Sequence, residues 1–187
     1  MNKKIVFFKT YTKMSTLMTT RFNNETWIEN QKYRIKHKIT CLYGSTQEMS
    51  PKIIHDSIVF MIEMNNSKNQ IEGIGLIRNN SLLDKYYKIY DTGNFNRYVY
   101  MSKYHIDRET LIRYNDKLVK ALDYVLFKEK THQKRGDGHT TFPDKLLKHK
   151  ICDGIDIKKE IRCIFIDNYG DKSTSKIFPE ENQVPKL

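Results

Sequence analysis

The segment that decides the fold is Ser57–Arg78, which reads SIVFMIEMNNSKNQIEGIGLIR. Two apolar runs, Ile58–Met64 and Ile71–Ile77, are joined by a short polar turn, and this pattern predicts a buried β-hairpin. The second run carries Gly73 and Gly75. Because alternate residues of a strand point to the same face, these two glycines leave a bare strip on it. Either a helix or a flat ligand can pack against such a strip.

The sequence around the hairpin predicts a single α+β domain over residues 1–170, followed by a polar tail at 171–187. Strands are expected at Lys3–Thr10, Arg97–Met101 and Ile161–Ile166, and a half-exposed strand or extended arm at Gln31–Leu42. Helices are expected at Thr12–Phe22, from an Asp107 cap to Arg113, and from an Asn115 cap to about Lys128. Because a hairpin rather than a helix joins the central strands, we expect a mixed or antiparallel β-barrel with helices outside it.

Charge is the most pronounced bulk property of the chain. The 187 residues carry a formal net charge of +11, with 33 Lys and Arg against 22 Asp and Glu. Such an excess attracts polyanions, so nucleic acid or another anionic surface is the partner class that it favours. A lysine-rich composition inherited from an AT-rich genome gives the same charge without any such partner.

The cysteines and the hydropathy favour an intracellular protein, cytoplasmic or nuclear. Cys41, Cys152 and Cys163 form no CxxC pair, which argues against a disulfide framework and a zinc ribbon. The N-terminal apolar run is too short for a signal peptide, and no run approaches the roughly 18 apolar residues of a membrane span. We therefore expect neither secretion nor a membrane association.

Catalytic motifs are absent from the sequence. There is no Gly-x-Ser-x-Gly, no Walker loop and no HExxH. His132 and His139 flank the basic loop, with Asp137 between them, and the three residues could act as metal ligands or as acid and base groups of a nucleic-acid-processing enzyme. A solvated loop explains the same residues, so we predict no catalytic residue, no metal and no cofactor.

Aromatic and basic residues together favour a nucleic-acid-binding module. Proteins that bind unpaired bases stack them on aromatic rings and contact phosphates with Lys or Arg. The candidate rings are those of Trp27, Tyr86, Tyr87 and Tyr90, and the candidate backbone contacts are Lys128, Lys130, Lys134 and Arg135. Each ring has core packing as its alternative, and the basic residues have a solvated loop as theirs.

Four stretches resemble the YTH domains and the related EVE domains of the PUA-like superfamily. Residues 3–13, KKIVFFKTYTK, followed by Trp27, resemble the opening of YTH domains, in which a strand ends in a Lys-Ser-Tyr type motif and a Trp follows a helix. The hairpin resembles the next element of that family. Residues 98–108, YVYMSKYHIDR, resemble its strand that leads into a helix, and KRGDG at 134–138 resembles its late Arg-Asp-Gly loop. The resemblance spans roughly residues 3 to 166.

The resemblance implies a PUA-like barrel that binds RNA through a modified base such as N6-methyladenine, with DNA as the alternative partner. Lys9, Thr10 and Tyr11 would line the base pocket, and Trp27 would form the first wall of an aromatic cage. The family's cage has two or three tryptophans and this chain has one, so a tyrosine would complete it, chosen from Tyr86, Tyr87, Tyr90 and Tyr98. In PUA-like folds the hairpin is chiefly barrel wall, which favours packing roles for its glycines. A protein-interaction or assembly subunit on the same scaffold is the alternative function.

Overall fold

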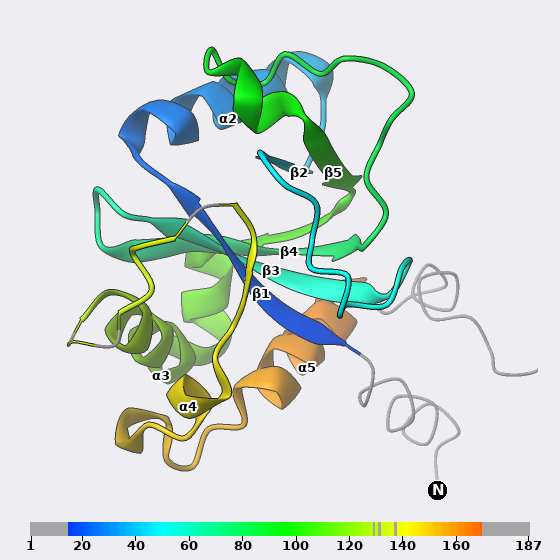
Figure 1. Cartoon of the computed structure of the whole chain (residues 1–187). Helices are drawn as coiled ribbons and strands as arrows, with labels where there is room; N and C mark the ends of the chain where they lie inside the picture. The colour runs from blue at the N-terminus through cyan, green and yellow to red at the C-terminus, as the bar shows by residue number, and fades with distance from the viewer. Residues whose placement is uncertain (1–14, 129, 131, 137, 170–187) are drawn as a thin grey trace, which may run out of the picture.

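The computed structural model describes residues 15–128, 130, 132–136 and 138–169. The chain forms an α+β domain around a five-stranded sheet with the strand order β6-β4-β3-β1-β7 (Figure 1). Its strands are β1 (Thr16–Phe22), β3 (Ile58–Asn65), β4 (Gln70–Arg78), β6 (Tyr104–Asp107) and β7 (Thr140–Thr141). A second sheet consists of β2 (Cys41–Ser45) and β5 (Tyr98–Ser102), which pair antiparallel.

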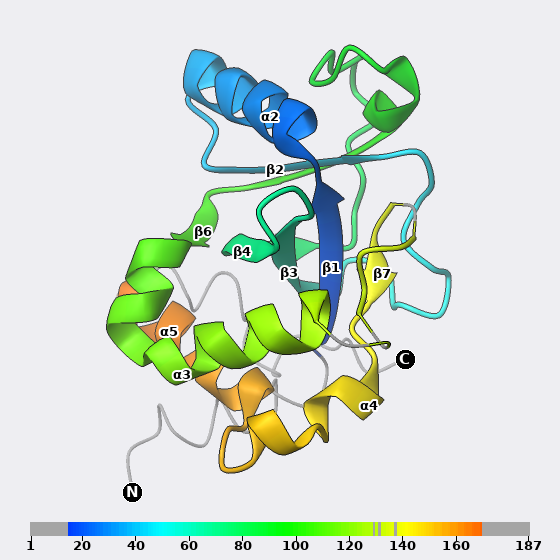
Figure 2. The ribbon, with the colours of Figure 1, turned by 90° about the vertical axis from the view of Figure 1, so that its left-hand side faces the viewer.

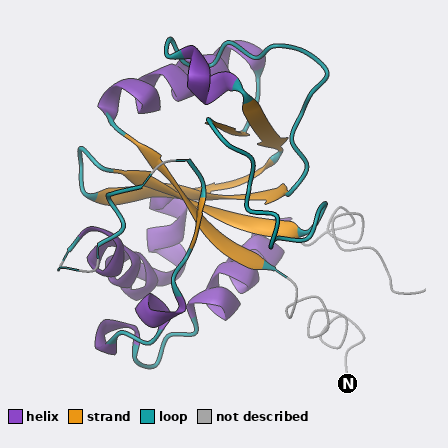
Figure 3. Cartoon of the chain, viewed as in Figure 1, coloured by secondary structure: helices purple, strands orange, loops and turns teal. Residues whose placement is uncertain are grey.

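Helices and the small sheet cover the two faces of the large sheet (Figures 2 and 3). On one face lie α3 (Arg108–Phe127), α4 (Asp144–Leu147) and α5 (Ile157–Tyr169); on the other lie β2, β5 and α2 (Asn24–His37). Two short 3-10 turns complete the described elements, η1 (Gly93–Asn96) and η2 (Lys150–Cys152). Each face has its own apolar core, so the molecule is built in three layers.

The predicted hairpin is confirmed as β3 and β4, the centre of the molecule. Every residue of β3 is buried, because alternate side chains enter the two cores: Phe60 and Ile62 face α3 and α5, while Val59 and Met61 face the small sheet. This explains why its sequence is a continuous apolar run rather than an alternating one. The strand β1 pairs parallel with β3, and β4 pairs antiparallel with it.

The bare strip on β4 is filled by the protein's own side chains, and not by a helix. A Cβ atom added at Gly75 would collide with the Tyr43 hydroxyl and would lie 2.5 Å from the Cys41 Sγ. A Cβ atom added at Gly73 would lie 2.8 Å from the His105 Nε2. The glycines therefore allow β2 and β6 to pack directly against the backbone of β4.

The predicted barrel is wrong, because the large sheet is open. Its edge strands are β6 and β7, and these do not pair with each other among the described residues. The helix that we predicted at Thr12–Phe22 is also wrong. Residues 16–22 instead form β1, whose partner β3 lies about 40 residues downstream, so non-local pairing overrides the local pattern. The predicted strand Lys3–Thr10 lies outside the described residues.

Two further predictions of strands are wrong because the segments are helical. Most of Gln31–Leu42 belongs to α2, which begins at a capping box in which the Asn23 side chain accepts from the Thr26 N–H at 2.8 Å. The two side chains that α2 buries, Asn30 and Arg34, are polar, so the helix has no apolar stripe to reveal it. Residues 161–166 lie in α5, whose buried side chains are Ile157, Ile161, Ile164 and Phe165, at helical spacing.

Other local predictions are confirmed. The strand expected at Arg97–Met101 is β5, displaced by one residue. Asp107 caps α3 by accepting from the Thr110 N–H at 2.7 Å. Asn115 departs from helical geometry inside α3, and its Oδ1 accepts from the Leu118 N–H at 3.0 Å, so it restarts the helix as a second cap.

Candidate functional site

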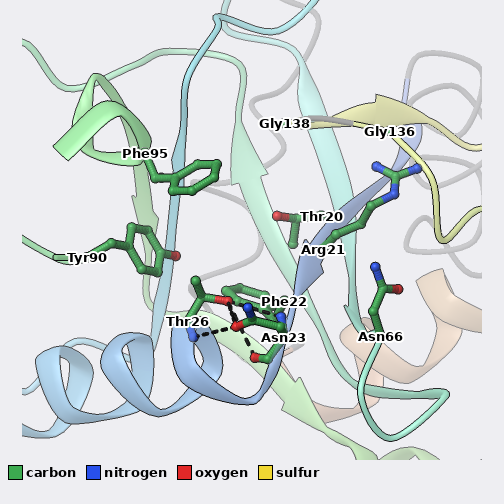
Figure 4. Close-up of a pocket in the computed structure, with 11 residues that line it drawn as sticks. Thr20, Arg21, Phe22, Asn23, Thr26, Asn66, Tyr90, Phe95, Gly136 and Gly138 are labelled. Carbon is green, nitrogen blue, oxygen red and sulfur yellow. Dashed lines mark hydrogen bonds between the residues drawn. The ribbon is translucent and has the colours of Figure 1, made fainter. Parts of the chain in front are cut away.

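A cavity of about 230 Å³ lies where β1 runs into α2, beside the small sheet (Figure 4). Aromatic side chains form one side of it and the polar side chains of β1 form the opposite side. Its lining comes from β1, α2, β2, the η1 region, the β3–β4 turn and the loop that follows α3: Thr20, Arg21, Phe22, Asn23, Thr26, Gly44, Asn66, Tyr90, Phe95, Gly136 and Gly138. The site therefore joins the β1–α2 junction to segments that lie up to about 115 residues further along the chain.

Tyr90 and Phe95 form an aromatic corner. Their ring centroids are 6.1 Å apart and their planes meet at 78°. Gly44 allows both to approach β2, because a Cβ atom there would collide with the Phe95 carbonyl oxygen and lie 2.9 Å from the Tyr90 Cε2. Two rings at right angles present a face and an edge to whatever lies between them.

Hydrogen bonds fix the aromatic corner in place. The buried Tyr90 hydroxyl accepts from the Asn30 Nδ2 at 3.0 Å, and burial raises the pKa of this phenol well above its usual value. The buried Asn96 side chain accepts from the backbone N–H groups of Ile89 and Tyr90 and donates to the Tyr90 carbonyl at 2.7 Å. The loop that carries the rings is thus anchored by two asparagines, which makes the corner a preformed wall.

The opposite wall combines Arg21 with the basic loop. The Arg21 Nε donates to the Gln133 carbonyl at 2.6 Å, and its Nη2 donates to the Thr140 Oγ1 at 2.9 Å. The Asn66 Nδ2 donates to the Lys134 carbonyl at 3.0 Å. These bonds hold the backbone of the basic loop against the rim of the cavity.

Glycines allow the basic loop to follow this path. Gly136 and Gly138 have φ values of 134° and 62°, in the region that favours glycine. A Cβ atom at Gly138 would lie 2.7 Å from the Ser45 Oγ, and one at Gly136 would lie 3.3 Å from the Arg21 guanidinium carbon. Both glycines line the cavity, so the segment that we predicted to contact a nucleic-acid backbone faces the aromatic corner across the cavity.

A buried carboxylate network holds the layers together beside the cavity. Glu63 of β3 has no exposed surface; its Oε1 accepts from the Tyr43 hydroxyl at 2.9 Å and lies 3.3 Å from the Arg34 Nη1. Its Oε2 lies 2.9 Å from the His105 Nε2. Burial on its own would raise the pKa of Glu63, yet the charges and hydrogen bonds of its three partners hold that pKa below its usual value. The network ties α2, β2 and β6 to the central strand.

The two histidines of the enzyme hypothesis lie in different environments. The His139 ring lies between Tyr43 and Tyr100, at centroid distances of 6.3 and 5.5 Å. Its ring nitrogens are buried without a hydrogen-bond partner in the described part of the chain. Burial and the nearby Arg21 charge lower the pKa of His139 to about 4, so the imidazole is neutral at pH 7. The His132 Nδ1 accepts from the Lys134 N–H at 3.3 Å, and Asp137 lies outside the described residues.

Among the ring candidates, Tyr90 lines the cavity and the four others do not. The Trp27 ring packs edge-on against Phe22 at 5.1 Å and is partly buried against the core under the small sheet. Tyr86 is 66% exposed, and its hydroxyl accepts from the Asn96 Nδ2 at 3.2 Å. Tyr98 lies on β5 and is partly buried against the same core as Trp27. Tyr87 is buried in that core, with its hydroxyl donating to Asp84 at 2.7 Å.

The other predicted residues fall into two groups. Lys9, Thr10 and Tyr11 lie outside the described residues. Lys128, Lys130 and Arg135 are exposed on the loop after α3, and the Lys134 Nζ donates to the Asn69 Oδ1 at 2.7 Å. Sequence reasoning missed Thr20, Arg21, Gly44, Asn66 and Phe95, because only the folded chain brings their segments together. The one available signal was Gly44, which interrupts the otherwise bulky run CLYGS.

Comparison with known proteins adds no assignment: no protein-family model, curated protein or solved structure matches the chain. Within the described ranges, no three His, Cys, Asp or Glu side chains are grouped so as to hold a metal ion. None of the helices in those ranges combines the length and the apolar character needed to cross a membrane. The described cysteines are all free thiols.

Proposed function

We propose that this protein is a nucleic-acid-binding module that takes one unpaired base, such as N6-methyladenine in RNA, into the cavity between Arg21 and the aromatic corner. The observation that carries the proposal is that the aromatic corner shares one cavity with the loop that holds Lys128, Lys130, Lys134 and Arg135. Aromatic rings bind a base through its face, and basic side chains bind the phosphates on either side of it.

The size of the cavity supports a single flat heterocycle. Its volume of about 230 Å³ is below the roughly 300–1,000 Å³ of pockets that hold drug-sized ligands. The base must therefore leave its stack to enter, which favours single-stranded regions. A methyl group on the base would gain dispersion contacts with Tyr90 and Phe95, which gives a physical reason for selecting a modified base.

The resemblance to YTH and EVE domains remains part of this proposal. It is supported by the hairpin at the centre of the sheet and by the basic loop beside the cavity. The open sheet departs from the closed barrel of that superfamily. The proposed cage also departs from it, since its walls are Tyr90 and Phe95 rather than a set of tryptophans.

The variant Phe95→Ala tests the proposal directly. Loss of one stacking ring is expected to weaken binding of a short RNA by about 1–3 kcal/mol, which corresponds to about 5- to 150-fold. Fluorescence anisotropy with methylated and unmethylated probes, at two salt concentrations, measures the affinity and its preference for the methyl group. Tyr114→Ala is the matched control, because it removes a ring on α3 that is 45% exposed and lies outside the cavity lining.

Two results would contradict the proposal. Equal affinities of Phe95→Ala and the unaltered protein would remove the aromatic corner from the binding site. Salt-sensitive binding that does not depend on the methyl group, with Phe95→Ala unchanged, would leave a basic protein without a base pocket.

A protein-interaction function is a second candidate because α2 exposes apolar side chains. Ile28 and Ile35 are 51% and 76% exposed. They are spaced i and i+7, so they share one face of the helix. Exposed apolar surface of this kind is often covered by a partner. If the oligomeric state of the protein, measured by light scattering, changes with Ile28→Lys and Ile35→Lys while RNA binding does not, this second function is favoured.

A further inference from the structure

The chain that follows α3 carries a concentrated positive charge. Residues 128–150 include seven Lys and Arg against three Asp and Glu, a net charge of 7 − 3 = +4 within 23 residues. The whole chain has a net charge of +11. About a third of the excess therefore lies in an eighth of the sequence, and such a concentration on one surface attracts a polyanion.

This segment leads from the cavity to the opposite end of the sheet (Figures 1 and 2). It follows the edge of the sheet beside β1, forms β7, and then continues into α4. Backbone bonds fix its course: the Gln133 N–H donates to the Leu126 carbonyl at 2.8 Å, and the Phe142 N–H donates to the Leu17 carbonyl at 2.8 Å. The basic loop and α4 therefore lie along one edge of the sheet, and the exposed described residues of this segment form the surface of that edge.

A second group of basic residues lies at the far end of that surface. Lys145 of α4, Lys150 of η2 and Lys148 between them are exposed, while Leu146 and Cys152 are buried and anchor the two short elements to the core. Their cationic ends are therefore presented outward by a fixed backbone. We call these three lysines the α4 patch.

An aromatic pair connects the α4 patch to the basic loop. The rings of Tyr124 on α3 and His149 beside η2 are 5.5 Å apart, and the Lys128 Nζ lies 5.7 Å from the Tyr124 ring centroid. Lys128 thus lies between the loop at the cavity and the lysines of α4. The acidic side chain nearest in sequence to the patch, Asp144, lies 4.0 Å from Lys158 of α5, which offsets its charge.

We infer that the nucleic-acid strand whose base enters the cavity continues along this surface, and that the α4 patch holds its flanking phosphates. The inference rests on the proposed function and extends it from one base to a single-stranded segment. The lysines of this surface would bind successive backbone phosphates, which RNA and single-stranded DNA share. Probes of both kinds therefore show which of the two nucleic acids the protein prefers.

The test uses single-stranded probes of two lengths, about 4 and about 16 nucleotides, the span of site sizes among single-strand-binding domains. The patch variant is Lys145→Gln, Lys148→Gln and Lys150→Gln. It should bind the short probe as the unaltered protein does and the long probe more weakly. The slope of log affinity against log salt for the long probe should become shallower by about 2, since each lost contact removes about 0.7 for single strands.

The matched control is a second triple variant, Lys32→Gln, Lys36→Gln and Lys38→Asn, on and just after the C-terminal half of α2. It removes the same charge from the far end of the molecule, and asparagine suits the left-handed backbone at Lys38, where φ is 55°. We expect this control to keep the salt slope of the unaltered protein. Circular dichroism of both variants verifies that they are folded.

The outcomes separate the inference from the proposed function. If the patch variant keeps the affinity and the salt slope for the long probe, the α4 patch does not hold the strand. Equal losses in the patch and control variants would show a general charge effect and would also overturn the inference. If the unaltered protein binds no short probe but the long probe depends on the patch, the base pocket fails while the backbone surface stands.

Discussion

The substitution Glu63→Gln removes a charge from the centre of the protein and keeps the shape of the side chain. The carboxylate is fully buried, and Arg34, 7% exposed, lies 3.3 Å from it. The neutral amide would leave the Arg34 guanidinium buried without its counter-charge. The NH2 group of Gln would also replace one carboxylate oxygen, so the hydrogen bond that this oxygen accepts from Tyr43 or His105 would be lost. Breaking a buried ion pair from one side costs about 3–5 kcal/mol, which is a third or more of the stability of many domains.

Urea unfolding followed by circular dichroism at pH 7 measures this loss. A decrease of about 3–5 kcal/mol corresponds to a melting temperature lower by roughly 6–20 °C for a chain of this size. The matched control is Asp56→Asn, which removes the partner of Arg78 in an ion pair whose side chains are 51% and 36% exposed. Exposed pairs contribute about 0–1 kcal/mol, so the control should stay close to the unaltered protein.

The pH dependence gives the same prediction a second test. The folded pKa of Glu63 is lowered, so its ionised form stabilises the fold fully above the unfolded value of about 4.3. This contribution is lost as the pH falls through the lower, folded value. The difference between the two proteins should therefore decrease as the pH falls below about 4.3.

Two results would refute this account of Glu63. One is a loss below about 1 kcal/mol at pH 7, which would place the carboxylate among weak, solvated pairs. The other is additivity in a double-mutant cycle with Arg34→Met. Because the double variant removes both charges, its loss should be well below the sum of the two single losses.

Three smaller predictions follow from the same packing. Trp27→Ala should lower stability by about 1–3 kcal/mol and leave the affinity of the folded protein for RNA unchanged, because the ring packs on Phe22 outside the cavity; unfolding and anisotropy measurements on one preparation compare the two. Gly75→Ala should lower stability by about 1–3 kcal/mol, since its methyl group would collide with Tyr43, and an unchanged unfolding midpoint would show that β2 can move away freely. For His139, with a folded pKa of about 4 against about 6.5 when unfolded, stability should decrease as the pH falls from 6.5 towards 4, because only the unfolded chain binds the proton there; an NMR titration of the imidazole near pH 6.5 would contradict this.

The sequence predicts those parts of the fold that depend on neighbouring residues. The hairpin and the caps at Asp107 and Asn115 are local, since a turn or a cap is decided within a few residues. The strand predicted at residues 161–166 was wrong because a six-residue apolar run fits a buried strand and a helix equally well. The prediction for β1 was wrong because the partner of this strand is distant in the sequence. The prediction for α2 was wrong because the residues that this helix buries are polar.

The candidate site was less predictable than the fold. Tyr90 was among the candidate rings, but a tyrosine in a tyrosine-rich segment gives no sign of which ring reaches a cavity. Phe95 and Arg21 face each other across the cavity from segments about 70 residues apart. Their meeting depends on β2, whose position no local pattern specifies. Side-chain chemistry could therefore be inferred, whereas the shape of the pocket could not.

The position of β2 connects the hairpin to the cavity. In β2, Tyr43 points toward the sheet, where its hydroxyl donates to Glu63 above the glycine strip of β4. At the next residue, Gly44, a side chain would lie on the opposite face of the strand. Because Gly44 has none, Tyr90 and Phe95 pack against the backbone there. A strand held from one side by the glycine strip thus supports the aromatic corner from the other. A methyl group at Gly75 should therefore displace both, so that Gly75→Ala weakens base binding as well as stability, whereas Trp27→Ala affects stability alone.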